Sequence, residues 1–364
     1  MKKICLLKYI DSKNVDGGQR VAANLANTFC EKYEVYFVAM INDGAELACQ
    51  LDDRVNLEII DMHGKRMRKI IPQLIRFLRS YFKKNEIKTV FSIGASMNMF
   101  AIFATIGLKI KTICCNHENF TRKAYKDRSQ RLNEKLGVFL SDYMIVLTKY
   151  DRDAIKKKFP VRKSKVMYIY NWIDDLAIKK EIGYNKESKR IMTVGRINPI
   201  KGMEDIVEIA DTVLKEHEDW EWDIFGAGEE DYIAQIESLI KERKLENRLH
   251  LRGQVNNLYE KYQDYAFCVM TSKSEGLPMV LLEAKGSKLP LVSYDCLTGP
   301  SEIIQNEVDG YLVELGNISE MIEKISYLME HEETREIFSN HSQDNLQKFS
   351  KSIILKQWEN LIEA

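Results

Sequence analysis

The chain contains 364 residues, of which 45% are hydrophobic and 30% are charged, and its formal net charge at pH 7 is zero. This composition is that of an ordinary globular protein and excludes a disordered or low-complexity chain, while the length suits two domains of about 150–200 residues. No window contains the roughly 18 or more apolar residues that a membrane-spanning helix needs.

Short apolar runs alternate with amphipathic stretches along the chain, as is typical of parallel sheets with crossover helices. Amphipathic stretches at 20–31 and 129–140 predict helices in the first half. The runs that predict strands there are 4–7, 35–40, 57–60, 89–93, 112–115, 143–147 and 166–170.

The alternation restarts after a charged stretch that contains Gly183 and ends at Lys189. In the second half, strands are expected at 190–195, 222–225, 249–251, 267–270 and 289–292. We therefore predict an α/β chain with two Rossmann-like domains. The predicted bounds are 1–172 for the first domain, 173–189 for the linker, 190–340 for the second domain, and 341–364 for a helical segment that packs back toward the first domain.

Seven cysteines are scattered along the chain, several of them inside apolar runs. Their odd number and irregular spacing argue against a disulfide framework and against a CxxC metal site. The first eight residues resemble the start of a signal peptide, but Lys8 and Asp11 interrupt the apolar run too early. The sequence therefore predicts buried thiols in a cytoplasmic protein.

The segment 271–284 places Glu275 and Glu283 eight positions apart, directly after a predicted strand. Pro278 suits the first helical position, where its missing N–H costs nothing, and the helix is expected at 279–286. A helix start after a parallel strand favours an anion through its free N–H groups and its dipole. Glu283 can accept two hydrogen bonds from a ribose diol, and Glu275 can reach a second polyol. Together these features predict a site for a nucleoside diphosphate sugar.

The pattern Ser-x-x-Glu-Gly-Leu-Pro-x-x-x-x-Glu-Ala resembles the Glu-x7-Glu motif of retaining glycosyltransferases of family 4 (glycosyltransferase group 1). The resemblance covers nearly the whole chain and is closest over 190–315. It implies the GT-B fold, in which two doubly wound Rossmann-like domains face an interdomain cleft. It also implies transfer of a sugar in the synthesis of bacterial exopolysaccharides, capsules or other surface glycans.

Two cations follow the strand expected at 190–195. Arg196 comes directly after it, and Lys201 precedes a helix expected at 203–215. A guanidinium and an ammonium one loop apart can clamp a pyrophosphate, and the matching pair in the family binds the donor diphosphate. Near the N-terminus, Asp16 is followed by Gly17 and Gly18, which resemble the glycine loop of the family near the donor phosphate and the acceptor.

The resemblance assigns further residues to the donor site. Val255 lies in a loop that lines the nucleotide base, and His117, at a strand end, either contacts the donor sugar or is structural. Thr298 and Gly299 either hold the sugar end of the donor or simply cap a helix. The remaining donor residues implied by the motif are Gly276, Leu277, Pro278 and Met279. A second glycine loop at 225–229 does not match a dinucleotide fingerprint, because Asp231 occupies the third glycine position.

The residues expected to act in catalysis are Glu275, His117, Arg196 and Lys201. The two cations and the helix N-termini can neutralise the departing diphosphate without a metal ion, and no cofactor is expected beyond the nucleotide sugar. Asp151 and Asp153 form an Asp-x-Asp pair, but they fall near a helix expected at 154–159, where acids suit the dipole. By resemblance the donor is a UDP-sugar, and donor-phosphate-assisted internal return fits better than double displacement.

The first half is basic. Residues 1–170 contain 32 Lys and Arg against 17 Asp and Glu, whereas 171–364 contain 22 against 37. The segment 65–84 contains eight basic residues, no acid, and apolar residues at helical spacing. This pattern fits a core helix with a solvated basic face or a helix that docks on an anionic membrane leaflet. The second reading predicts a peripheral enzyme on the inner face of the plasma membrane with a lipid-linked acceptor, such as an undecaprenyl-diphosphate glycan. Nucleic acid is not expected, because no reader motif is present.

Two other function classes fit parts of the sequence. A catalytically inactive partner subunit could bind a sugar nucleotide, although the intact set of Glu275, Glu283, Arg196 and Lys201 argues against it. Another GT-B enzyme, such as a nucleotide-sugar epimerase or a phosphorylase, would share the fold. No lysine pattern resembles the phosphorylase cofactor site, and epimerase activity would appear as donor turnover without an acceptor.

Overall fold

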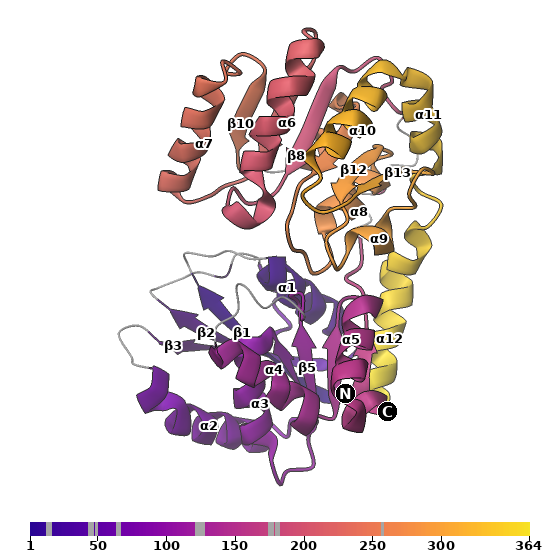
Figure 1. The fold of residues 1–364 in the computed structure, drawn as a ribbon. Helices are drawn as coiled ribbons and strands as arrows, with labels where there is room; N and C mark the ends of the chain where they lie inside the picture. The colour runs from indigo at the N-terminus through magenta and orange to yellow at the C-terminus, as the bar shows by residue number, and fades with distance from the viewer. Residues whose placement is uncertain are drawn as a thin grey trace. The chain divides into compact units, whose positions relative to one another are not determined.

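The computed structural model describes residues 1–11, 17–42, 47, 50–62, 67–120, 128–173, 178, 183–255 and 258–364. These residues form two compact units. The first comprises Met1–Ile169 with Ile362–Ala364, and the second comprises Tyr170–Leu361. Both units are α/β, and each contains a parallel sheet (Figure 1).

The described part of the first unit contains a seven-stranded sheet with the order β3-β2-β1-β4-β5-β6-β7. Each strand pairs in parallel with its neighbours in this sheet. The order reverses direction at β1, so the carboxyl ends of β1 and β4 flank a topological switch point. The strands are β1 (Lys3–Asp11), β2 (Glu34–Asn42), β3 (Asn56–Asp61), β4 (Thr89–Ile93), β5 (Lys111–Asn116), β6 (Tyr143–Val146) and β7 (Val166–Tyr168).

Helices cover both faces of this sheet because successive strand residues point to opposite sides. On one face, Val90 of β4 joins a core with α2 and α3. On the other, Phe91 meets Phe29 of α1 with ring centroids 5.8 Å apart. The helices are α1 (Gly17–Phe29), α2 (Met67–Lys84), α3 (Asn98–Thr105), α4 (Arg128–Leu140) and α5 (Lys149–Lys158).

The described part of the second unit contains a six-stranded parallel sheet with the order β10-β9-β8-β11-β12-β13. Here the order reverses at β8, which again places the carboxyl ends of β8 and β11 at the switch point where ligands bind in such sheets. The strands are β8 (Arg190–Val194), β9 (Glu221–Phe225), β10 (Leu249–Gly253), β11 (Phe267–Met270), β12 (Leu291–Tyr294) and β13 (Gly310–Val313).

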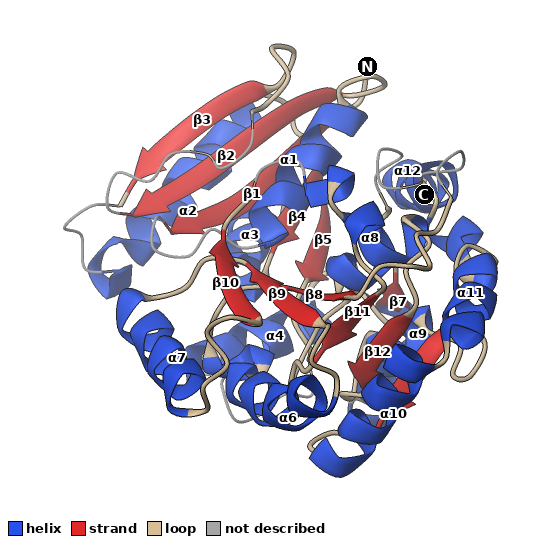
Figure 2. Cartoon of the chain, turned by 90° about the horizontal axis from the view of Figure 1, so that it is seen from above, coloured by secondary structure: helices blue, strands red, loops and turns tan. Residues whose placement is uncertain are grey.

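One face of the second sheet packs on α6, α7 and α10 through a continuous apolar core centred on Trp222 and Phe267, and Figure 2 shows these helices side by side along the sheet. Helix α8 instead contacts β11 and β12 outside that core. The helices are α6 (Met203–Glu216), α7 (Glu230–Glu242), α8 (Met279–Gly286), α9 (Pro300–Ile303), α10 (Ile318–Glu330), α11 (Glu332–His341) and α12 (Lys351–Glu363). The last residues of α12 belong to the first unit, where Tyr33 donates to Glu363 at 3.0 Å.

The structure corrects several sequence-based bounds. Strand β13 was not predicted, because Gly310–Val313 begins with a glycine directly after Asp309, a pair that is typical of a turn. Helix α5 begins at Lys149 rather than at 154, because the Thr148 hydroxyl caps it by accepting from the Asp151 amide. Pro278 is the N-cap of α8, with extended backbone, rather than its first helical residue.

The thiols behave as the sequence predicted within the described residues. Six cysteines are free and buried, and Cys49 lies outside the described residues. Burial raises the pKa of Cys114 to about 12, so this thiol stays protonated. Every helix in the described part of the chain is too short or too polar to cross a bilayer.

Candidate functional site

The loops that follow β8 and β11 are joined by three hydrogen bonds. The Thr271 hydroxyl donates to the carbonyls of Lys201 and Gly202 at 2.9 and 3.0 Å, and the Lys273 amide donates to the Ile200 carbonyl at 2.8 Å. Gly202 has a φ of +66°, and an added Cβ would lie 2.3 Å from the Thr271 carbonyl oxygen. Only glycine fits this turn, which fixes where Lys201 leaves the backbone.

Lys201 and Glu275 form an ion pair across these two loops. Both side chains are mostly buried, with 24% and 11% of their surface exposed. The Lys201 chain also lies over Gly195, whose added Cβ would meet it at 3.7 Å. The pair places the cation expected to bind diphosphate beside the carboxylate expected to bind sugar, although 74 positions separate them in the sequence.

The loop that carries Arg196 packs against the second glycine loop. An added Cβ at Gly226 would lie 1.9 Å from the Gly195 carbonyl oxygen, and one at Gly228 would lie 2.3 Å from that of Ile197. The Gly195 amide donates to the Phe225 carbonyl, and the Ile197 amide donates to the Ala227 carbonyl. These glycines therefore allow two backbones to approach closely, which explains a glycine loop without a dinucleotide fingerprint.

The loop at 275–278 also contacts the segment before α9. The Thr298 hydroxyl donates to the Glu275 carbonyl. Gly299 has a φ of +99°, and an added Cβ would lie 2.4 Å from Pro278 Cδ and 2.9 Å from the Gly276 carbonyl oxygen. Thr298 and Gly299 thus hold the loop that presents Glu275, and Gly299 also serves as the N-cap of α9.

Glu283 lies on α8, one turn beyond its start, and is 8% exposed. Tyr259 and Tyr262 each donate a phenolic O–H to one of its oxygens, at 3.2 and 3.3 Å. Burial, with the nearby Glu283 carboxylate, raises the pKa of Tyr262 well above its ordinary value. Tyr262 therefore stays a donor and orients the carboxylate. The first residue of the helix, Met279, is half-buried.

A second ion pair anchors α8 to the segment between α9 and β13. Lys285 pairs with Asp309, and both side chains are completely buried. Lys285 also donates to the Ile303 carbonyl at the end of α9, at 2.8 Å, and Asp309 accepts from the Gln305 amide at 3.0 Å. Burial lowers the pKa of Lys285 and raises that of Asp309. These contacts connect α8 to the end of α9 and to the segment that follows it.

The first unit carries the remaining predicted residues. Gly17 and Gly18 are the first two residues of α1, and an added Cβ at Gly17 would meet no atom of the described residues within 4 Å. Asp16, which precedes them, lies outside the described residues.

His117 is half-buried and follows β5 directly. The Asn116 amide group donates to Glu134 at 3.1 Å, and its oxygen accepts from the Glu118 amide at 3.2 Å. Three residues on, the Phe120 amide donates to Asp151 at 3.0 Å. The loop that presents His117 is thus held at both ends by buried polar side chains.

These contacts explain the Asp-x-Asp pair. Asp151 is 1% exposed and is bonded to Phe120 and Thr148, whereas Asp153 forms an exposed ion pair with Arg152. The two carboxylates therefore have separate partners. Across the described residues, no group of three or more His, Cys, Asp or Glu side chains could hold a metal ion.

The second unit thus brings together Lys201, Glu275, Thr298 and Gly299, and it places Glu283 on the adjoining helix. Val255 follows β10 and is half-buried, and residues 256–257 lie outside the described set. Sequence reasoning missed the two tyrosines and the Lys285–Asp309 pair. The i,i+3 spacing of Tyr259 and Tyr262 was the only sequence signal for the tyrosines. No feature of the sequence indicates that Lys285 pairs with Asp309.

Two family models match consecutive parts of this chain. The model described as Glycosyltransferase Family 4 matches residues 15–175, and that described as Glycosyl transferases group 1 matches residues 174–345. The chain is 27% identical over 368 residues to the amylovoran biosynthesis glycosyltransferase AmsD of Erwinia amylovora, covering 98% of this chain and 99% of that one.

A second relative is GalNAc-alpha-(1->4)-GalNAc-alpha-(1->3)-diNAcBac-PP-undecaprenol alpha-1,4-N-acetyl-D-galactosaminyltransferase of Campylobacter jejuni, 24% identical over 371 residues, with 100% and 98% coverage. Among solved structures, HepE of Anabaena in complex with UDP and glucose superposes with a TM-score of 0.84 at 15% identity over the whole of both chains. The two family models, the two parallel-sheet units and this similarity of fold together show that the chain is a GT-B glycosyltransferase and belongs to family 4.

Proposed function

We propose that this enzyme transfers a sugar from a UDP-sugar to a glycan acceptor with retention of anomeric configuration. The observation that carries the proposal is the Lys201–Glu275 pair at the switch point of the second sheet, beside the start of α8. A cation, a carboxylate and a helix N-terminus meet where a diphosphate and its sugar would have to lie. We assign Glu283, one turn along the helix, to the ribose.

In the proposed reaction, the bond between the anomeric carbon and the diphosphate oxygen breaks as the acceptor oxygen bonds to that carbon on the same face. The acceptor proton passes to a donor phosphate oxygen, and UDP leaves. Arg196, Lys201 and the α8 N-terminus neutralise the charge that develops on the leaving diphosphate. Glu275 orients the sugar and is held by the Thr298–Gly299 segment. We assign Gly17 and Gly18 to donor binding and His117 to catalysis, as the family resemblance implies. These residues supply the charge stabilisation without a metal ion.

The proposed acceptor is a lipid-linked glycan at the inner surface of the plasma membrane, in surface polysaccharide synthesis. Two observations support this part of the proposal. The first half of the chain has an excess of basic residues, and a relative over the full length is named for an undecaprenol-linked substrate. An enzyme that uses such an acceptor has to work at an anionic surface.

The direct test is nucleotide release from a panel of UDP-, GDP- and ADP-sugars, with and without EDTA and with a lipid-linked acceptor extract. We expect one UDP-sugar to turn over, resistance to EDTA, and an α-linked product from an α-linked donor by NMR. Inversion of configuration or complete loss with EDTA would contradict the proposed mechanism. UDP binding without turnover on any acceptor would favour a catalytically inactive subunit, and donor conversion without an acceptor would favour an epimerase.

The ribose role of Glu283 gives a binding prediction. Glu283→Ala is expected to weaken UDP binding about 10- to 100-fold, because a hydrogen bond to a charged group contributes roughly 1.5–3 kcal/mol. Isothermal titration calorimetry measures the change. Glu260→Ala removes an exposed glutamate from the neighbouring turn and is expected to bind UDP normally. Wild-type affinity in Glu283→Ala would refute the ribose role.

A further inference from the structure

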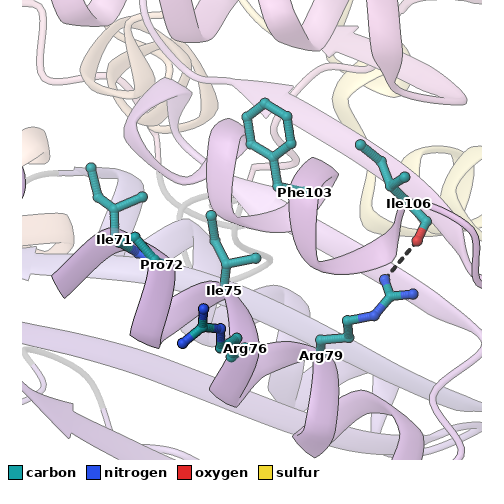
Figure 3. Close-up of a pocket in the computed structure, with 7 residues that line it drawn as sticks. All are labelled: Ile71, Pro72, Ile75, Arg76, Arg79, Phe103 and Ile106. Atoms are coloured by element: carbon teal, nitrogen blue, oxygen red, sulfur yellow. Dashed lines mark hydrogen bonds between the residues drawn. The ribbon is translucent and has the colours of Figure 1, made fainter.

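A hollow of about 550 Å³ lies between α2 and α3 of the first unit and is separate from the residues assigned to the reaction. Apolar side chains make up most of its lining, and two arginines complete it. Figure 3 shows its seven residues, Ile71, Pro72, Ile75, Arg76, Arg79, Phe103 and Ile106. We call this feature the α2–α3 groove.

Helix α2 presents two stripes of side chains at a spacing of four residues, which places each stripe along one line of the helix. Leu74, Leu78 and Phe82 are buried in the core of the first unit. Ile71 and Ile75, on the next line, are only partly buried and line the groove. The apolar face of α2 is therefore wider than its core contact requires.

Arg79 fixes the opposite wall. Its Nη1 donates to the Ile106 carbonyl at 2.6 Å (Figure 3) and to the Ala104 carbonyl at 3.2 Å, and so caps the end of α3. These bonds hold Phe103 and Ile106 across from α2, where they are 38% and 55% exposed. A guanidinium has five N–H donors, and this cap uses two of them. The groove is thus preformed, with apolar walls and guanidinium groups at its side.

The two helices that form the groove carry charge of one sign only. Helix α2 contains six Lys or Arg and no Asp or Glu, and α3 contains no charged residue. Phe77, also on α2, is 41% exposed. Apolar groups and cations on one surface, without an acid between them, match a ligand that combines a hydrocarbon chain with a phosphate. An anionic bilayer presents both chemistries in one plane, and each Lys or Arg near it contributes about 1 kcal/mol.

We propose that the α2–α3 groove docks the enzyme on an anionic phospholipid bilayer, taking a lipid chain between Ile75 and Phe103 while Arg76 binds the lipid phosphate. The inference deepens the proposed function, because it rests on the peripheral site of action proposed above and names the surface responsible. Arg76 is exposed beside the apolar lining, where its aliphatic stem can lie on the groove while its head reaches a phosphate.

The test is cosedimentation of the full-length enzyme with phosphatidylcholine vesicles that contain or lack phosphatidylglycerol. Wild-type enzyme is expected to bind only the anionic vesicles. Arg76→Glu should weaken binding about 30-fold, since it reverses one surface charge. Lys241→Glu, a matched reversal of an exposed lysine on α7 of the second unit, should weaken it less than about threefold. The double variant Phe103→Ser with Ile106→Ser, which keeps every charge, should weaken it about tenfold.

Equal effects of Arg76→Glu and Lys241→Glu, with no effect of the serine variant, would show attraction by charge alone and overturn the groove. Failure of the wild type to bind anionic vesicles, or stronger binding to single-stranded RNA, would also overturn it. Circular dichroism on each variant verifies folding, and UDP calorimetry verifies that the donor site is unchanged, because none of the groove residues is assigned to that site. Vesicle binding without sugar transfer would refute the proposed function while leaving the docking surface intact.

Discussion

Lys201→Ala is expected to lower kcat about 10²- to 10³-fold, the range found when one charge-stabilising donor is removed from an active site. The reason is that Lys201 is the cation held directly beside Glu275 by the Thr271 bonds. If it stabilises the leaving diphosphate, its effect should be larger in the transition state than in the ground state, so KM for the donor should rise much less than kcat falls. Steady-state nucleotide release measures both constants.

A neighbouring lysine provides the control for this experiment. Lys273 lies in the same joined loops, is 39% exposed and pairs with Asp205 at 3.3 Å. Lys273→Ala removes the same charge and should keep kcat within about twofold, because exposed ion pairs contribute little. Lys201→Arg should retain part of the activity, since it keeps the charge but not the shape of the ammonium group. Equal losses in Lys201→Ala and Lys273→Ala would show that only the overall potential matters.

The second large effect is on stability. Lys285→Met is expected to lower the free energy of unfolding of the second unit by about 3–5 kcal/mol, because it leaves the buried Asp309 carboxylate without its cation. All four tryptophans, Trp172, Trp220, Trp222 and Trp358, belong to this unit. Urea unfolding followed by tryptophan fluorescence therefore reports on it selectively. The measurement is made without nucleotide, whose binding would add stability.

A double variant distinguishes the cost of leaving one buried charge unpaired from the contribution of the ion pair itself. Burial shifts the pKa of Lys285 down and that of Asp309 up, because removal from water disfavours the charged form of each group. Lys285→Met combined with Asp309→Asn should therefore recover most of the loss, as the amide oxygen of Asn can still accept from Gln305. Lys324→Met, which breaks an exposed pair with Glu323, should cost less than about 1 kcal/mol. No recovery in the double variant would point to packing of the lysine stem instead.

Much of the fold follows from local patterns that can be recognised in the sequence. Buried parallel strands are short continuous apolar runs, and twelve of the described strands begin within three residues of a run predicted here. Strand β13 was missed because Asp309 and Gly310 form a turn signal at its start, which leaves an apolar run of only three residues. The start of α5 was misplaced although its cap is local, because the Thr148 hydroxyl accepts from the Asp151 amide three residues on; only the bond from Asp151 to the loop after β5 is tertiary.

By itself, the sequence determined the alternation of strands and helices, the family through the Glu275-to-Glu283 spacing, and the basic amphipathic character of α2. Each of these is a property of residues within about 20 positions of one another. Only the tertiary structure decided that Lys201 meets Glu275, that Tyr259 and Tyr262 orient Glu283, and that Lys285 meets Asp309. These contacts join different loops of the sheet edge, where strand order rather than chain order sets the neighbours. The α2–α3 groove likewise depends on how two helices pack, so no single stretch of the sequence could show it.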